Sequence, residues 1–183
     1  MRAIIAAAML ALAAAAGERG VLTEIDMSGD LPRACVCAPA GATMKDDPDG
    51  WRNLHFGAAV EQLTNCGVRA ELAAARRGWV EYRAASLPPF GGVPLRAARL
   101  VYKTAGSNVT GLVHLRFFAD GQNYRKLAGA FKRRFGQPDR IVEDDGTLDT
   151  WIGRKTMISI LHLYGADVQV DVISTAMLRV VRQ

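Results

Sequence analysis

The chain has 183 residues, of which 50% are apolar and 22% are charged, and its formal net charge is +5. A chain of this length buries enough surface to hold a core without a metal or many disulfides. The apolar content, with no long polar or repetitive tract, excludes a disordered or low-complexity chain. The sequence therefore predicts a soluble globular protein, although it does not by itself establish a function.

The first sixteen residues have the pattern of a secretory signal peptide. Arg2 supplies a positive charge, and an unbroken apolar run from Ala3 to Ala16 ends in small residues before Gly17. Because a membrane-spanning helix needs about 20 apolar residues, this run is too short to be an anchor. We interpret residues 1–16 as a cleaved signal peptide and expect a periplasmic or secreted protein with no transmembrane anchor.

Residues 17–50 are rich in turn-forming residues, and we expect an irregular N-terminal segment there. The segment ends in the acidic run Asp46–Gly50, which we interpret as a solvated turn. It contains Cys35 and Cys37, and the third cysteine of the chain is Cys66. In an oxidising compartment the default is a disulfide, here between Cys66 and either Cys35 or Cys37.

The alternative for these cysteines is a metal site completed by His55. Cys35 and Cys37 are two residues apart, so in a strand their side chains point the same way. Two thiolates, Cys66 and an imidazole suit a tetrahedral soft-metal site, but the spacing is not that of a usual C-x₂₋₄-C unit. The disulfide explains the same residues, so we expect no metal and no other cofactor.

Residues 51–118 combine one helix with several strands. The helix rests on four residues at helical spacing, followed by a glycine cap: Ala59, Val60, Leu63, Cys66 and Gly67. In chain order we expect a short strand at Trp51–Phe56, a helix opened by Gly57, a strand at Trp79–Ala84, an irregular proline-rich stretch at Leu87–Pro94, and a hairpin of Ala97–Thr104 with Val109–Phe118.

The clearest predicted element is a helix at Tyr124–Phe135. Its apolar residues form one stripe on a helical wheel: Leu127, Ala128, Phe131 and Phe135. Gly136 follows as the residue after the helix, and Pro138 is typical of a stop. The sequence therefore predicts an amphipathic helix with one buried face.

Residues after the helix predict strands and a short tail. The strands are expected at Arg140–Glu143, Asp149–Ile152, Met157–Tyr164 and Val168–Ile173, and the tail at residues 175–183. Together the elements predict an α+β fold, with an antiparallel sheet packed against one or two helices. We expect a single domain at 51–174, with the finer hypothesis of two α-β-β-β modules in tandem at 51–118 and 121–174.

Charge is concentrated in the middle of the chain. Between Cys66 and Arg140 the sequence carries fourteen Lys or Arg residues and only four acidic ones. Such an asymmetry favours an anionic partner, and export makes nucleic acid an unsuitable one. We expect an envelope protein or an anionic envelope component as the partner. It would be bound either by the exposed face of the sheet or by the basic segment, for which the candidates are the basic residues of the predicted helix: Arg125, Lys126, Arg133 and Arg134.

Catalytic motifs are not found in the sequence. It has no nucleophile elbow, no zinc-protease motif and no glycine-rich phosphate loop, so we expect no catalytic residue. The alternative is an envelope hydrolase with a carboxylate pair, for which Asp145 and Asp149 are the candidates. The preferred interpretation is a non-catalytic binding or protein-interaction module.

The order of elements resembles that of known envelope proteins. Phe56-Gly57 opens a short helix, strands follow, and a second helix ends in Phe135-Gly136-Gln137-Pro138. This arrangement, over about Trp51 to Ser174, resembles the BamE/SmpA envelope proteins and the β-lactamase-inhibitor-like tandem modules. The resemblance implies a protein that acts by protein contact rather than by catalysis, and it implies no particular functional residues.

Overall fold

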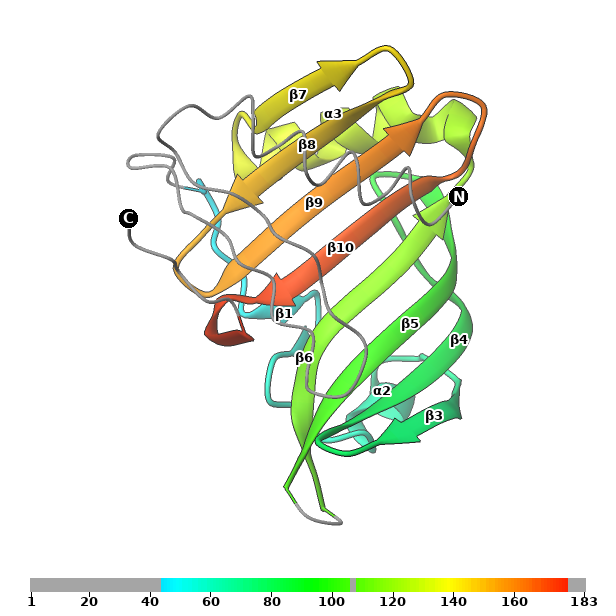
Figure 1. Cartoon of the computed structure of the whole chain (residues 1–183), viewed down its shortest axis with the longest axis vertical. Helices are drawn as coiled ribbons and strands as arrows, with labels where there is room; N and C mark the ends of the chain where they lie inside the picture. The colour runs from blue at the N-terminus through cyan, green and yellow to red at the C-terminus, as the bar shows by residue number, and fades with distance from the viewer. Residues whose placement is uncertain (1–43, 106–107, 178–183) are drawn as a thin grey trace.

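An antiparallel sheet of eight strands dominates the protein, in the order β3-β4-β5-β6-β10-β9-β8-β7 (Figure 1). The computed structural model describes residues 44–105 and 108–177. The predicted signal peptide, residues 17–43 of the predicted irregular segment with Cys35 and Cys37, and residues 178–183 of the predicted tail lie outside these residues.

The elements of the described part follow one another with short connections. Their bounds are β1 Gly50–Trp51, β2 Leu54–His55, α2 Gln62–Asn65, β3 Ala70–Arg76, β4 Trp79–Phe90, β5 Val93–Ala105, β6 Asn108–Ala119, the 3₁₀ turn η1 Gly121–Asn123, α3 Tyr124–Phe135, β7 Asp139–Glu143, β8 Gly146–Ile152, β9 Thr156–Leu163, β10 Val168–Ser174 and the 3₁₀ turn η2 Thr175–Met177. β1 and β2 form a separate two-stranded sheet.

Two halves of the chain build one continuous sheet. The first half contributes a meander of β3 to β6, and the second contributes a meander of β7 to β10. The last strands of the two meanders pair with each other, with Val172 opposite Leu115 and Val170 opposite Phe117. Each half is therefore a helix followed by four strands, and the two meanders share one sheet.

The expected α+β class is wrong, because the fold is mainly β. The helix predicted from Gly57 shrinks to the four residues of α2. The first residues of the predicted helix form hydrogen bonds with β6 instead. The Gly57 N–H donates to the Leu112 carbonyl at 2.9 Å, and the Leu112 N–H donates to the Ala58 carbonyl at 3.0 Å. α3 is the only long helix among the described residues.

The strands of the first half are also longer than predicted. The stretch expected to be irregular belongs to β4 and β5, which extend to Phe90 and from Val93. Pro88 and Pro89 fit in β4 because the pairing of β4 with β3 ends at Ala84, so no ladder on that side needs their missing N–H groups. The register with β5 also shifts there, which accommodates the prolines.

An aromatic cluster beneath α3 forms the centre of the core. Phe131 is fully buried and packs against the rings of Trp51, Phe90, Phe135 and Trp151 at centroid distances of 5.6, 4.7, 5.5 and 5.6 Å. α3, α2 and β1 all contribute to this core, so they cover the same face of the sheet. We call that face the inner face and the opposite one the outer face.

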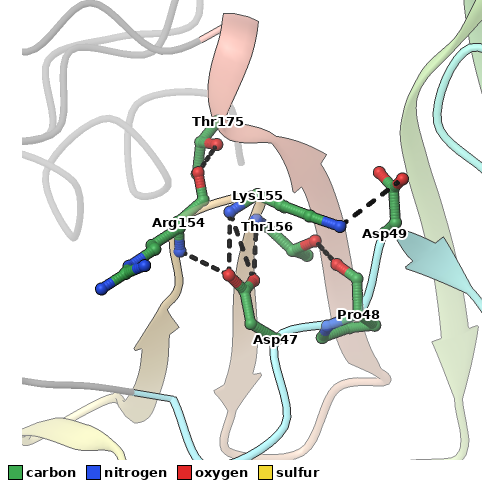
Figure 2. A network of polar contacts seen from close by, with 7 residues as sticks. All are labelled: Asp47, Pro48, Asp49, Arg154, Lys155, Thr156 and Thr175. Carbon is green, nitrogen blue, oxygen red and sulfur yellow. Dashed lines mark hydrogen bonds and ion pairs between the residues drawn. The ribbon is translucent and has the colours of Figure 1, made fainter.

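The acidic run at Asp46–Gly50 is not a solvated turn, because Asp47 attaches it to the turn between β8 and β9. We call these contacts of Asp47 the latch. The Asp47 carboxylate accepts backbone N–H groups from three successive residues, Arg154 at 2.7 Å, Lys155 at 3.0 Å and Thr156 at 3.2 Å. Figure 2 shows this carboxylate pointing into the β8–β9 turn. The Thr156 hydroxyl donates to the Pro48 carbonyl. A Cβ at Gly153 would overlap the same carboxylate, so a larger residue there would displace the Asp47 side chain.

Loss of the Asp47 charge is expected to loosen this latch. Asp47→Asn replaces a carboxylate that accepts three N–H groups, so we expect a loss of about 1.5–3 kcal/mol in the free energy of unfolding. Urea denaturation measures it. Asp49→Asn is the matched control, since Asp49 only approaches Lys155 at 4.0 Å with both side chains mostly exposed, and it should change stability by less than about 0.5 kcal/mol. Equal effects of the two substitutions would contradict the latch.

Candidate functional site: an arginine row on the outer face

The outer face carries the side chains that alternate with the core residues along each strand. On β10, Val168, Val170 and Val172 are in the core, so Gln169, Asp171 and Ile173 belong to the outer face. α3 lies behind the sheet in Figure 1, and the outer face is towards the viewer. The functional candidates of the structure lie on this face.

A single row of polar residues crosses the outer face from one edge of the sheet to the other. Each member lies directly opposite the next on the neighbouring strand. From β3 to β7 in sheet order, the row is Glu71, Arg83, Arg99, Arg116, Asp171, Ser159, Thr150 and Asp139. Three arginines, Arg83, Arg99 and Arg116, therefore lie side by side on β4, β5 and β6. We call these three residues the arginine row.

The outer two of these arginines have acidic partners. Arg83 Nε lies 3.0 Å from Glu81, although 61% of the Arg83 side chain stays exposed. Arg116 Nε donates to Asp171 at 2.7 Å. Arg99, the middle one, is exposed and has no ion-pair partner among the described residues.

The Asp171 carboxylate is fully engaged in contacts with neighbouring side chains. Besides Arg116, it contacts His114 Nε2 and accepts from Gln169 Nε2, both at 2.7 Å. Burial raises the pKa of this carboxyl, but the charge of Arg116 and the His114 contact outweigh burial and hold the pKa well below its usual range. Asp171 in turn raises the pKa of Arg116. Asp171 therefore fixes one end of the arginine row as a permanent ion pair.

A shallow hollow of about 610 Å³ opens beside Arg99. Its charged lining is Arg69, Glu71, Arg83 and Arg99, and its apolar lining includes Phe118 and a patch of alanines. We call it the arginine hollow. The lining has three arginines and one glutamate, so the hollow has an excess of positive charge.

A bulge in β5 shapes the hollow. The register between β5 and β6 shifts between Arg96 and Arg99, and Ala97 within this bulge has φ +50°. A non-glycine residue in the left-handed region costs about 1–3 kcal/mol and is concentrated at functional sites. Bulges likewise re-aim side chains next to sites. The strain is therefore located in the lining of the arginine hollow.

The basic surface predicted on the helix is not gathered into one site. Lys126 Nζ donates to the Gly92 carbonyl at 2.9 Å, and Arg134 pairs with Asp46 at 2.9 Å. Arg125 and Arg133 are exposed on α3, on the side of the sheet away from the arginine row. Two of the four predicted residues are thus engaged in holding neighbouring segments.

The two carboxylates predicted for a hydrolase are in unlike settings. Asp149 is fully buried, and Arg140 binds both its oxygens, at 2.5 and 2.7 Å. The Tyr124 hydroxyl also donates to Asp149 at 3.0 Å, and burial with the charge of Asp149 raises the pKa of Tyr124 to about 12. Asp145 is exposed in the β7–β8 turn. Asp149 thus anchors the start of α3 to β8 and β7.

Cys66, the predicted disulfide partner, follows α2. It is half-buried, and its thiol lies 3.4 Å from the Asn53 carbonyl. Because Cys35 and Cys37 lie outside the described residues, the disulfide stays a prediction. His55, the fourth residue of the alternative metal site, is exposed at the end of β2.

The arginine row could not be found from the sequence. Arg83, Arg99 and Arg116 are 16 and 17 residues apart, and only the strand register brings them into line. The excess of basic residues between Cys66 and Arg140 was the one available signal, and it did not single out these three.

None of the helices in the described ranges has the length and hydropathy that a membrane span requires. The resemblance to small envelope modules stays a prediction. The chain matched no family model, no curated protein and no solved structure.

Proposed function

We propose that the protein is an exported, non-catalytic binding module that holds an anionic group of an envelope partner in the arginine hollow. One observation carries the proposal: Arg83, Arg99 and Arg116 lie directly opposite one another on three neighbouring strands, and the middle one has no acidic partner among the described residues. The export part of the proposal rests on the predicted signal peptide.

Electrostatics supports an anionic ligand at this point. Like charges directly opposite on paired strands destabilise a sheet. Glu81 and Asp171 offset this repulsion at Arg83 and Arg116, which leaves Arg99 as the uncompensated charge. A guanidinium presents its donors as a planar fork that matches a carboxylate or phosphate in two parallel hydrogen bonds. An anion above Arg99 would therefore remove repulsion and gain hydrogen bonds together.

The strained bulge supports the same assignment. A residue such as Ala97 keeps a costly backbone conformation only where the surrounding structure imposes it. The bulge lies in the first half of β5, directly before Arg99, and the side chains around it are mostly alanines. The result is an accessible cation with room for a ligand.

Titration with glutarate, a small dicarboxylate, tests the proposal. In ¹⁵N-labelled protein the Nε–Hε signals of Arg99 and Arg83 are expected to shift and saturate, and the Arg83 signal, which the Arg99 and Arg125 variants both keep, gives the Kd in every protein. Arg99→Gln should raise the Kd by about ten- to a hundredfold, since a hydrogen bond to a charged group contributes about 1.5–3 kcal/mol. Arg125→Gln is the matched control, because Arg125 is an exposed arginine on α3, and it should leave the Kd unchanged.

Two outcomes would contradict the arginine hollow as the site. One is a glutarate response that follows Arg125, Lys126, Arg133 and Arg134 instead, which would place the anionic surface on α3. The other is a glutarate response that never saturates and is lost equally in Arg99→Gln and Arg125→Gln. That result would indicate unspecific charge screening.

A further inference from the structure

The arginine hollow adjoins a free edge of the sheet. Arg69, which directly precedes β3, and Glu71, which lies within it, both line the hollow, and β3 is an edge strand of the sheet. Among the described residues it pairs with β4 alone. One row of its backbone N–H and C=O groups therefore faces away from the sheet.

The two edges of the sheet differ in their protection. β7, the other edge, has three charged residues among its five, and charge on an edge strand discourages pairing with another chain. β3 has four alanines among its seven residues and an exposed leucine, Leu72, with 60% of its surface accessible. Of the two edges, β3 is the one suited to receive a further strand.

The hairpin geometry identifies a backbone group that points outwards. β3 and β4 are joined by the two-residue turn Arg77-Gly78, and Arg76 lies opposite Trp79. The closing pair of such a hairpin exchanges both hydrogen bonds, so the next pair, Ala75 and Val80, is of the non-hydrogen-bonded type. The Ala75 N–H therefore points away from β4.

Charge around this edge favours an acidic partner. Arg69 precedes β3, Arg76 ends it and Arg77 follows, while Glu71 is its single acidic residue. Neighbouring strands lie about 4.8 Å apart, and alternate side chains of an added strand would share the outer face with the arginine row. On the outer face, the nearest neighbours of a carboxylate on that strand would be Arg69 and Glu71, with Arg83 one strand further in and Arg99 two strands further in. The carboxylate would therefore have to extend past Glu71 towards Arg69 and Arg83.

We propose that β3 receives an extended acidic peptide segment of the partner as a ninth strand, with a carboxylate side chain of that segment in the arginine hollow. Backbone hydrogen bonds to the edge would supply affinity, and the arginines would select acidic side chains, as is general for strand addition. The inference rests on the proposed function, because it identifies the anionic group as a side chain of a peptide.

The test uses a synthetic peptide of alternating glutamate and valine, with glutarate as the second ligand. Ala75→Pro removes the outward N–H without removing a hydrogen bond to β4. We expect it to raise the Kd of the peptide at least tenfold and to leave the Kd of glutarate unchanged. Ala75→Val keeps the N–H and should bind both ligands as the unsubstituted protein does.

A second readout keeps the test independent of folding. Peptide binding should slow hydrogen exchange of the Ala75 N–H in the unsubstituted protein, and unchanged glutarate binding shows that Ala75→Pro is folded. If Ala75→Pro binds the peptide normally, strand addition is wrong while the proposed function stands. If glutarate binds neither the unsubstituted protein nor the two Ala75 variants, the proposed function itself fails. Binding to phosphatidylglycerol vesicles without binding to the peptide would also overturn the inference.

Discussion

Phe131→Ala is expected to lower the free energy of unfolding by about 3–5 kcal/mol, the usual cost of deleting a fully buried ring. Phe131 is 0% exposed, and its ring packs against those of both Trp51 and Trp151. Its loss would remove the contact between α3 and the sheet at the centre of the core. Urea denaturation followed by tryptophan fluorescence measures the effect, because two of the three tryptophans border the cavity.

Val142→Ala is the matched control for this substitution. Val142 is also apolar, but it lies on the edge strand β7 with 64% of its surface exposed. Its truncation should change stability by less than about 0.5 kcal/mol. A loss below about 1 kcal/mol in Phe131→Ala would contradict the packing of α3 on the aromatic cluster.

The sequence predicts local structure where one periodicity dominates. The helix at Tyr124–Phe135 was predicted with the bounds that the structure has, since its apolar stripe, Gly136 and Pro138 all agree. The predicted strand at Val168–Ile173 ends one residue before β10 does. The predicted strand at Met157–Tyr164 begins and ends one residue later than β9. These elements follow from local patterns alone.

Tertiary contacts explain what the sequence did not predict. Gly57 and Ala58 have a helical pattern after them, but hydrogen bonds to Leu112 hold them against β6. Pro88 and Pro89 are typical of a break in a strand, yet they lie where β4 has no neighbour on the β3 side. In both places pairing with another strand, or the absence of such pairing, decides the structure.

The candidate site was beyond local patterns for the same reason. A strand register is set by pairing between strands, and a shift of one residue would place Arg99 on the inner face. Basic composition indicated an anionic partner but favoured the helix, where the arginines are adjacent in sequence. The arginine row instead requires the register of β4, β5 and β6 together.

Asp171→Asn is expected to cost about 3–5 kcal/mol of stability at pH 7, because it removes one partner of a buried ion pair. Asp171 is 3% exposed and holds Arg116, His114 and Gln169 together. Without its charge, Arg116 would face Arg99 with no compensation, so repulsion along the arginine row would add to the loss. Asp167→Asn is the matched control, since Asp167 pairs with Arg96 while both side chains are 51% exposed, and it should cost less than about 1 kcal/mol.

The effect of Asp171→Asn should depend on pH in one direction. Since the pKa of Asp171 in the folded protein lies below its value of about 3.9 in the unfolded chain, its contribution is complete above about pH 4 and declines as the pH falls further. The difference in stability between the unsubstituted protein and Asp171→Asn should therefore be constant from pH 5 to 7 and shrink towards pH 2. Urea denaturation at these pH values measures it. A difference that grows as the pH falls would mean that Asp171 is protonated in the fold, and then the arginine row would lack the carboxylate that holds its end in place.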